Sequence, residues 1–302
     1  MTIFPYDEFA KGYLTELLSS IGKIDSSRKV ATEVKEIDIY YTLDPQGVVD
    51  EQKKQILGLL GRFATTAAMF EPFRNAATPG EVRSCANKLF DIFAEIERKA
   101  KRDKTKVIEA ELPRLWILSP TASKPLLKGF SATLDEGWIE GVYFCGEHWK
   151  TVIVAIHKLP RTPETLWLRV LGRGKFREQA VAEVQALPAD NPLRSVAMNL
   201  LSNLKATLEV KQGKNKEDEK FLMQLSPIYE RDLAEATQRG RQEGQCIIVE
   251  NLLTARFGSL DPELLAIVQP IVNLPPSEYS RLLLQLANLS REDLLTRFSS
   301  GS

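Results

Sequence analysis

Two acidic side chains stand two residues apart in a short segment rich in β-branched and aromatic residues. The segment reads EVKEIDIYY over residues 33–41, and it contains Glu36 and Asp38. Because side chains alternate across a strand, these two carboxylates share one face, whereas Glu33 and Lys35 share the other. Carboxylate oxygens are ligands that Mg²⁺ prefers, together with water and substrate phosphate. The segment therefore predicts either a magnesium-binding acidic rim or the solvated end of a strand.

The bulk composition narrows the classes of protein that could carry such a site. The chain has 302 residues, with 40 basic and 40 acidic side chains, so it has no overall charge to attract nucleic acid and would need local basic patches. Three cysteines without a Cys-x-x-Cys pair and only two histidines argue against a zinc site. No signal-peptide pattern and no apolar run long enough to span a bilayer is visible, so we expect a cytoplasmic protein without a membrane partner.

The elements that must position the acidic segment can be read from hydrophobic periodicity. Helical spacing predicts helices over 6–20 and 50–70, and a further long helix starts at Thr78, where Thr-Pro-Gly-Glu is a capping box. Strands are predicted at 27–31 and 34–43, which are rich in Val, Ile and Tyr, and the turn signal Asp-Pro-Gln-Gly follows the second of them.

The middle of the chain predicts the core of a sheet. Three apolar runs bounded by proline, glycine or serine lie at 113–120, 141–145 and 150–160. Such unbroken runs are typical of strands buried on both faces. Together with the helices, they predict an α/β domain over 1–210, with a mixed central sheet flanked by helices.

The composition changes after residue 210. The stretch KQGKNKEDEK has no large apolar side chain, and we expect a charged linker and a polar helix over 211–245. Proline, glycine and serine then divide several leucine-rich segments over 246–302, which predict a small all-α domain. So small a domain is marginally stable alone, so we expect it to pack either against the first domain or against another copy, which would make the protein a homo-oligomer.

Several stretches resemble a known group of proteins. The first helix with Asp7 and Lys11, the strand EIDIYY and the segment PRLWILSP resemble the transposase-like, recombination-promoting nucleases of the Rpn type. These belong to the PD-(D/E)xK nuclease superfamily, and GRQEGQ with the leucine-rich tail resembles the helical domain of unknown function that often follows them. The resemblance implies a restriction-endonuclease-like fold and a Mg²⁺-dependent endonuclease that acts on DNA.

Carried onto this sequence, the resemblance implies Asp38 as the first metal-binding acid, assisted by Glu36. The side chains that would stabilise charge on the phosphate are Lys35, Lys11 or Arg114. The resemblance also implies a second acid and a lysine or glutamine on the next core strand. The strand predicted at 113–120 contains no acid, and the nearest ones, Glu109 and Glu111, precede it.

Two clusters of basic residues could contact a phosphate backbone. The candidate DNA-binding residues are Lys99, Lys101, Arg102, Lys104, Arg173 and Lys175. The first four lie where the second long helix should end, and a solvated helix end is the favoured explanation for them, because cations favour the negative end of the helix dipole.

Three functions therefore remain open at this stage. The first is a metal-dependent DNA endonuclease of the transposase or recombination-promoting type. The second is a non-catalytic scaffold that binds DNA or a protein and oligomerises through its helical C-terminal part. The third is an antitoxin-like or regulatory component of a mobile element.

Overall fold

The computed structural model describes residues 5–30, 35–44, 51–188, 190–210 and 216–298. It divides the chain into two compact units, unit 1 over Met1–Ser226 and unit 2 over Pro227–Ser302. The division falls within the segment predicted as a linker and polar helix, and one helix, α9 (Lys216–Phe257), runs through it.

Unit 1 is built around a mixed sheet, which has seven strands in the described part of the chain, in the order β1-β2-β3-β4-β7-β6-β5. The strands are β1 (Lys23–Val30), β2 (Lys35–Thr42), β3 (Ala68–Pro72), β4 (Arg114–Ser119), β5 (Thr133–Leu134), β6 (Val142–Phe144) and β7 (Thr151–Ala155). Strands β1, β2 and β3 pair antiparallel, β3, β4 and β7 pair parallel, and β7, β6 and β5 return to antiparallel pairing. This sheet confirms the predicted mixed α/β architecture.

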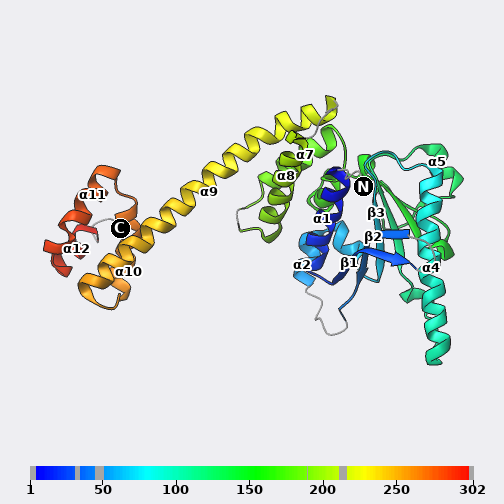
Figure 1. Ribbon diagram of the computed structural model, residues 1–302, viewed down its shortest axis with the longest axis horizontal. Coiled ribbons are helices and arrows are strands. Elements are labelled where there is room, and N and C mark those ends of the chain that lie inside the picture. Colours follow the sequence, from blue (N-terminus) through cyan, green and yellow to red (C-terminus); the bar gives the residue numbers. More distant parts are fainter. Residues whose placement is uncertain (1–4, 31–34, 45–50, 189, 211–215, 299–302) are drawn as a thin grey trace. The chain divides into compact units, whose positions relative to one another are not determined.

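Helices cover both faces of this sheet. In Figure 1, α1 lies on one side of β2 and β3, and α4 lies on the other. Helix α8 packs along α1. The helices of unit 1 before α9 are α1 (Pro5–Ser19), α2 (Glu51–Leu57), α3 (Leu59–Phe63), α4 (Pro79–Asp103), α5 (Lys124–Gly129), α6 (Leu166–Arg169), α7 (Lys175–Gln185) and α8 (Pro192–Val210).

The prediction of one helix over 50–70 is wrong. The segment forms the short helices α2 and α3, and the chain then enters the buried strand β3. Gly58, between the two helices, has φ +55°, and a Cβ there would lie 2.4 Å from the Glu164 carbonyl oxygen. A positive φ favours glycine, and this residue therefore ends the first helix.

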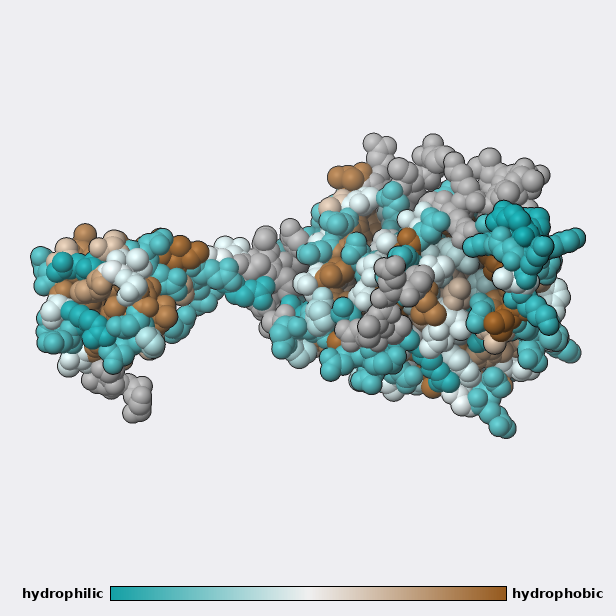
Figure 2. Space-filling model, turned by 90° about the horizontal axis from the view of Figure 1, so that it is seen from below, coloured by the Kyte–Doolittle hydropathy of each residue, from teal (hydrophilic) through white to brown (hydrophobic). Residues whose placement is uncertain are grey.

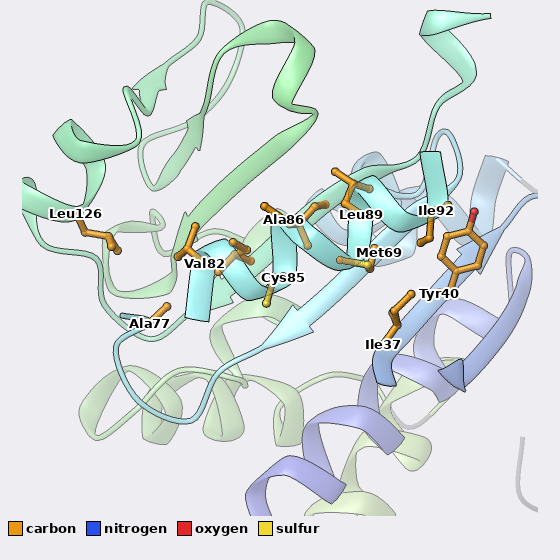
Figure 3. Packing of buried hydrophobic residues seen from close by; sticks show 12 residues of the cluster. Ile37, Tyr40, Met69, Ala77, Val82, Cys85, Ala86, Leu89, Ile92 and Leu126 are labelled. Carbon is orange, nitrogen blue, oxygen red and sulfur yellow. The ribbon is translucent and has the colours of Figure 1, made fainter. Parts of the chain in front are cut away.

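Helix α4 begins as the sequence predicts. The Thr78 hydroxyl accepts a hydrogen bond from the Glu81 backbone N–H at 3.3 Å, while the Thr78 backbone N–H donates to the Glu81 carboxylate at 2.7 Å. Figure 3 shows its apolar stripe facing Met69 of β3 and the neighbouring strand β2. This packing places α4 directly over the ends of β2 and β3.

Unit 2 is helical, as the sequence predicts for the C-terminal region. It contains the later part of α9 with α10 (Pro262–Val272), α11 (Pro276–Gln285) and α12 (Arg291–Phe298). Its core gathers apolar side chains from all four helices, among them Val249, Leu253, Leu264, Ile267, Leu282 and Leu294. Asp261 caps α10 by accepting from the Leu264 backbone N–H at 2.9 Å, and this bond begins the helix where proline follows.

The visible surfaces mix polar and apolar residues. Figure 2 shows brown areas among teal ones on unit 2, at the left of that view. Apolar side chains that are exposed in unit 2 include Ile247, Ile248, Leu265 and Leu284. Across the residues that the structure describes, no helix combines the length and apolar character needed to cross a membrane.

Candidate functional site

A second carboxylate faces Asp38 from the neighbouring strand. Strands β2 and β3 pair antiparallel with Ile39 opposite Phe70 and Tyr40 opposite Met69, and Asp38 and Glu71 are the residues next to the Ile39–Phe70 pair. The Glu71 carboxylate accepts a hydrogen bond from the Asp38 backbone N–H, so the two residues are direct neighbours. The two acids therefore form a pair across adjacent strands.

Each of these acids is bound by a lysine from a different helix. Lys11 of α1 places Nζ 2.7 Å from Asp38 Oδ1. Lys88 of α4 places Nζ 2.9 Å from both carboxylate oxygens of Glu71. The Glu71–Lys88 pair is the more enclosed of the two, since its side chains are only 4% and 14% exposed. Helices from both faces of the sheet thus supply cations to one acidic pair.

The electrostatics follow from this crowding of charge. Burial, followed by the negative charge of Asp38, raises the pKa of Glu71 from 4.5 to about 7, although Lys88 and the Asp38 backbone N–H act in the opposite direction. Burial lowers the pKa of Lys11, but the hydrogen bond to Asp38 and the surrounding acids outweigh it and raise the pKa overall. Glu71 can therefore change its protonation near neutral pH, whereas Lys11 stays charged.

The negative charges of the acidic pair also raise the pKa of two neighbouring groups, Asp7 and Cys85. Burial and the charge of Asp38 raise the pKa of Asp7, on α1. Burial and the charge of Glu71 raise the pKa of the Cys85 thiol on α4, whose Sγ lies 3.6 Å from Glu71 Oε2. Cys85 is thus held as a neutral thiol and is not a nucleophile.

Asp38 of the acidic pair lines a cleft of about 380 Å³ in unit 1, and the buried Glu71 directly precedes the lining residue Pro72. Its lining residues include Asp7, Lys11 and Asp38, followed by the turn after β3 and the first turn of α4, namely Pro72, Phe73, Arg74, Asn75 and Glu81. Arg173 reaches the same turn, because its Nη1 donates to Asn75 Oδ1 at 2.7 Å. The cleft is thus bordered by acids and cations, as expected for a site that handles a metal ion or an anion.

Of the residues proposed for catalysis, the structure brings Lys11 and Asp38 into direct contact. Glu36 is exposed on β2, and its charge contributes to the raised pKa of Lys11. Lys35 begins β2, but its side chain lies outside the described part, as does Glu33. Arg114 begins β4, where it contacts the rings of Trp116 and Phe144 and not the acidic pair.

The proposed DNA-binding residues separate into two places. Lys99, Lys101, Arg102 and Lys104 are exposed at the end of α4. At about 1.5 Å per residue, they lie roughly 27–35 Å along the helix from Glu81 at the cleft. Arg173 is bonded to the cleft wall, and exposed Lys175 follows it at the start of α7. Of the two groups, the second is the one with a described contact to the cleft, through Arg173 and Asn75.

The sequence interpretation missed Glu71 and Lys88. The signal that could have drawn attention to Glu71 is Pro72 directly after it, because proline is disfavoured inside the helix that was predicted there. Lys88 stands where the helical pattern of α4 predicts an apolar side chain, but its contact with Glu71 depends on how α4 packs on the sheet.

Comparisons with other proteins leave the site to be judged on its own chemistry. None of the comparisons with protein-family models, curated proteins and solved structures finds a match for this chain. Among the described residues, no group of three or more His, Cys, Asp and Glu side chains is arranged to hold a metal ion. The acidic pair of Asp38 and Glu71 is therefore the feature that a functional proposal must explain.

Proposed function

We propose that unit 1 is a restriction-endonuclease-like domain that hydrolyses phosphodiester bonds of DNA with the help of a divalent cation, Mg²⁺. The observation that carries this proposal is the position of Glu71 on the core strand next to Asp38, with Lys88 on its carboxylate. The PD-(D/E)xK pattern requires a second acid on that neighbouring strand and a nearby cation. In this chain Phe73 stands where the pattern has its lysine, and Lys88 of α4 supplies the cation instead.

The order of elements supports the same proposal. Helix α1 is followed by the antiparallel strands β1, β2 and β3, with the short helices α2 and α3 between β2 and β3, and then by the long helix α4 and the parallel strand β4. This arrangement fits the mixed sheet flanked by helices that the resemblance implies. It also brings the ends of β2 and β3 beside the first turn of α4, where the cleft opens.

The two acids fit a magnesium ion in their donor chemistry. Mg²⁺ takes one or two carboxylates, several waters and substrate phosphate oxygens, so Asp38 and Glu71 form a sufficient protein contribution. The raised pKa of Glu71, caused partly by the charge of Asp38, records a repulsion between the acids that a cation would relieve. A bound Mg²⁺ would polarise the phosphoryl group and acidify a bound water.

The remaining work falls to residues of the chain. Lys11 and Lys88 hold the acids in place before the cation binds, through contacts of 2.7 and 2.9 Å. In the reaction, Lys88 stabilises negative charge on the phosphate while the oxygen of a water bonds to phosphorus and loses a proton to solvent, and the bond to the leaving oxygen breaks as that oxygen takes up a proton from solvent. Its enclosed position beside Glu71 strengthens that effect, because water screens it weakly.

A plasmid-nicking assay tests this proposal. Supercoiled DNA is incubated with Mg²⁺ and wild-type protein, Asp38→Asn, Glu71→Gln or Lys88→Met, and the exposed helix residue Glu97→Gln serves as a control. Each site variant should lose at least about a hundredfold in rate, the scale for removal of a group that stabilises the transition state. Cleavage that survives Asp38→Asn unchanged, or a wild-type protein that does not cleave, would count against catalysis.

A second function, that of an oligomerising scaffold, has its own support in unit 2. In its helices, the side chains of Ile247, Ile248 and Leu284 are 50% to 82% exposed. Large apolar side chains exposed together mark surfaces that bind another protein chain. Size-exclusion chromatography with light scattering tests this function on the wild type and on Leu284→Lys. An oligomer that the substitution dissociates supports it, and a monomeric wild type refutes it.

A further inference from the structure

A fully buried carboxylate at the start of α9 is tied to the wall of the cleft. The Asp218 side chain is 0% exposed, and its Oδ1 accepts a hydrogen bond from the Tyr6 hydroxyl at 3.0 Å. The same oxygen lies 3.3 Å from Arg74 Nη2. Burial of a carboxylate is costly unless it is hydrogen-bonded and paired with a cation, so Asp218 requires partners in these positions.

The Arg74 guanidinium is held from several directions. Besides Asp218, it lies over the ring of Tyr6, with Cζ 4.4 Å from the ring centroid. Its backbone belongs to a segment that is tethered on both sides. The Phe73 N–H donates to the Leu118 carbonyl oxygen at 2.8 Å, and the Ala77 N–H donates to Ser119 Oγ at 3.0 Å. Arg74 is therefore preorganised where the chain passes from β3 to α4.

The preorganised side chain also faces the proposed site. Arg74 lines the cleft together with Asp7, Lys11 and Asp38, and its side chain remains 23% exposed. Its charge lowers the pKa of Asp7, against the larger effect of burial. A guanidinium presents five N–H donors in a planar fork that matches the oxygens of a phosphate. An arginine that was needed only to neutralise Asp218 would not have to reach the cleft.

We propose that Arg74 binds a backbone phosphate of the nucleic-acid substrate and that Asp218, from the first turns of α9, positions it. The inference rests on the proposed phosphodiesterase function and adds a substrate-binding residue to that site. It also makes the beginning of α9 part of the machinery of unit 1. Arg74 acts on the substrate itself, while Asp218 is a positioning residue that acts through Arg74.

Salt-dependent DNA binding tests the role of Arg74. Affinity for a fluorescein-labelled duplex is measured by anisotropy over a range of KCl concentrations, with all variants in a Glu71→Gln background so that the DNA stays intact. Arg74→Gln should reduce the slope of log affinity against log salt by about 0.9, the value for one lost phosphate contact on duplex DNA. Arg74→Lys should retain the slope and lose affinity severalfold, because lysine keeps the charge without the fork.

Arg62→Gln is the matched control for this measurement. Arg62 also lies over an aromatic ring, with Cζ 3.6 Å from the centroid of Trp138, but it does not line the cleft. For Arg62→Gln, the slope of log affinity against log salt should equal that of the parent protein. A slope unchanged by Arg74→Gln overturns the phosphate contact, and equal losses in Arg74→Gln and Arg62→Gln overturn its localisation to the cleft.

A double-mutant cycle tests the role of Asp218. Asp218→Asn should weaken binding about tenfold when Arg74 is present and should have no effect in an Arg74→Gln protein. An equal loss in both backgrounds overturns the positioning role. If tryptophan fluorescence shows that Asp218→Asn does not fold, Tyr6→Phe replaces it, because this change removes one hydrogen bond to Asp218 and keeps the ring under Arg74. Tyr6→Phe should lower the affinity for DNA two- to threefold when Arg74 is present and should have no effect in an Arg74→Gln protein.

Binding and cleavage separate the two levels of the proposal. If the wild type cleaves DNA and the Arg74 slope does not change, the phosphate role fails and the phosphodiesterase function stands. If the wild type does not cleave but Arg74→Gln alters the slope, catalysis fails and the cleft remains a nucleic-acid site.

Discussion

Replacement of Glu71 by glutamine should change how the stability of unit 1 depends on pH. The folded protein raises the pKa of this carboxyl from 4.5 to about 7, because the group is buried and lies near Asp38. The folded chain therefore holds the proton more tightly than the unfolded chain does. Glu71 contributes most to stability below about pH 4.5, and this contribution is lost as the pH rises through about 7.

The size of the effect follows from the two pKa values. Their difference of about 2.5, at about 1.36 kcal/mol for each pKa unit, corresponds to about 3 kcal/mol in the free energy of unfolding. Most of this contribution should be lost between pH 5 and pH 8. Glu71→Gln does not titrate, so the stability of the wild type should fall relative to the variant over that interval.

Urea denaturation followed by tryptophan fluorescence measures this difference. All four tryptophans of the chain, at positions 116, 138, 149 and 167, lie in unit 1, so the signal reports that unit. Subtracting the variant from the wild type at each pH removes the contribution of groups common to both. Glu97→Gln, on the exposed face of α4, controls for the loss of one negative charge.

Two results would refute the reasoning. If the curves for wild type and Glu71→Gln run parallel from pH 5 to pH 8, Glu71 keeps the same charge throughout. If the wild type instead gains stability relative to the variant as the pH rises through about 4, the pairing with Lys88 outweighs burial. Either result would mean that the acidic pair is already neutralised without a metal ion.

Three further substitutions test the architecture. Phe221→Ala should lower the free energy of unfolding of unit 1 by about 3–5 kcal/mol, because this side chain of α9 is 2% exposed and its ring centroid lies 3.8 Å from Cζ of Arg177. An unchanged tryptophan transition would place this part of α9 outside unit 1. Leu253→Ala, in the core of unit 2 at a 0% exposed position, should lower the free energy of unfolding of unit 2 by about 2–5 kcal/mol, measured by circular dichroism, and should leave the tryptophan transition unchanged. A shift of both transitions would contradict two separate units. Thr78→Ala should cost unit 1 about 1 kcal/mol in urea denaturation through loss of the α4 cap, and an unchanged midpoint would show that the capping box contributes nothing.

The elements with one dominant local signal could be predicted from the sequence. Strands β4, β6 and β7 lie within unbroken apolar runs, and α4 begins at a capping box that needs only four neighbouring residues. The C-terminal helices are separated by prolines and glycines, which act locally as well. In each of these cases the residues that decide the structure are adjacent in the chain.

Strand β3 could not be predicted in the same way. Leu59, Leu60 and Phe63 have true helical spacing, and Phe70 happens to continue it, although it belongs to a strand. A strand of five residues that is buried on both faces has no alternating pattern, so periodicity cannot separate it from a helix. The missed strand also hid Glu71, and the expected site therefore lacked its second acid.

The lysine at this site shows why spacing alone could not complete the prediction. A lysine two residues after the acid would project from the same strand and face, but here proline and phenylalanine occupy the next two positions. Lys88 instead lies on the buried stripe of α4, three residues after Cys85 and four before Ile92, where a helical pattern predicts an apolar side chain. A charge on that stripe is costly unless it meets a partner, and Glu71 is the partner that the packing of α4 provides. Lys88, as a charged residue within the apolar pattern of α4, thus indicated a buried ion pair in the sequence, and only the fold could show that Glu71 is its partner.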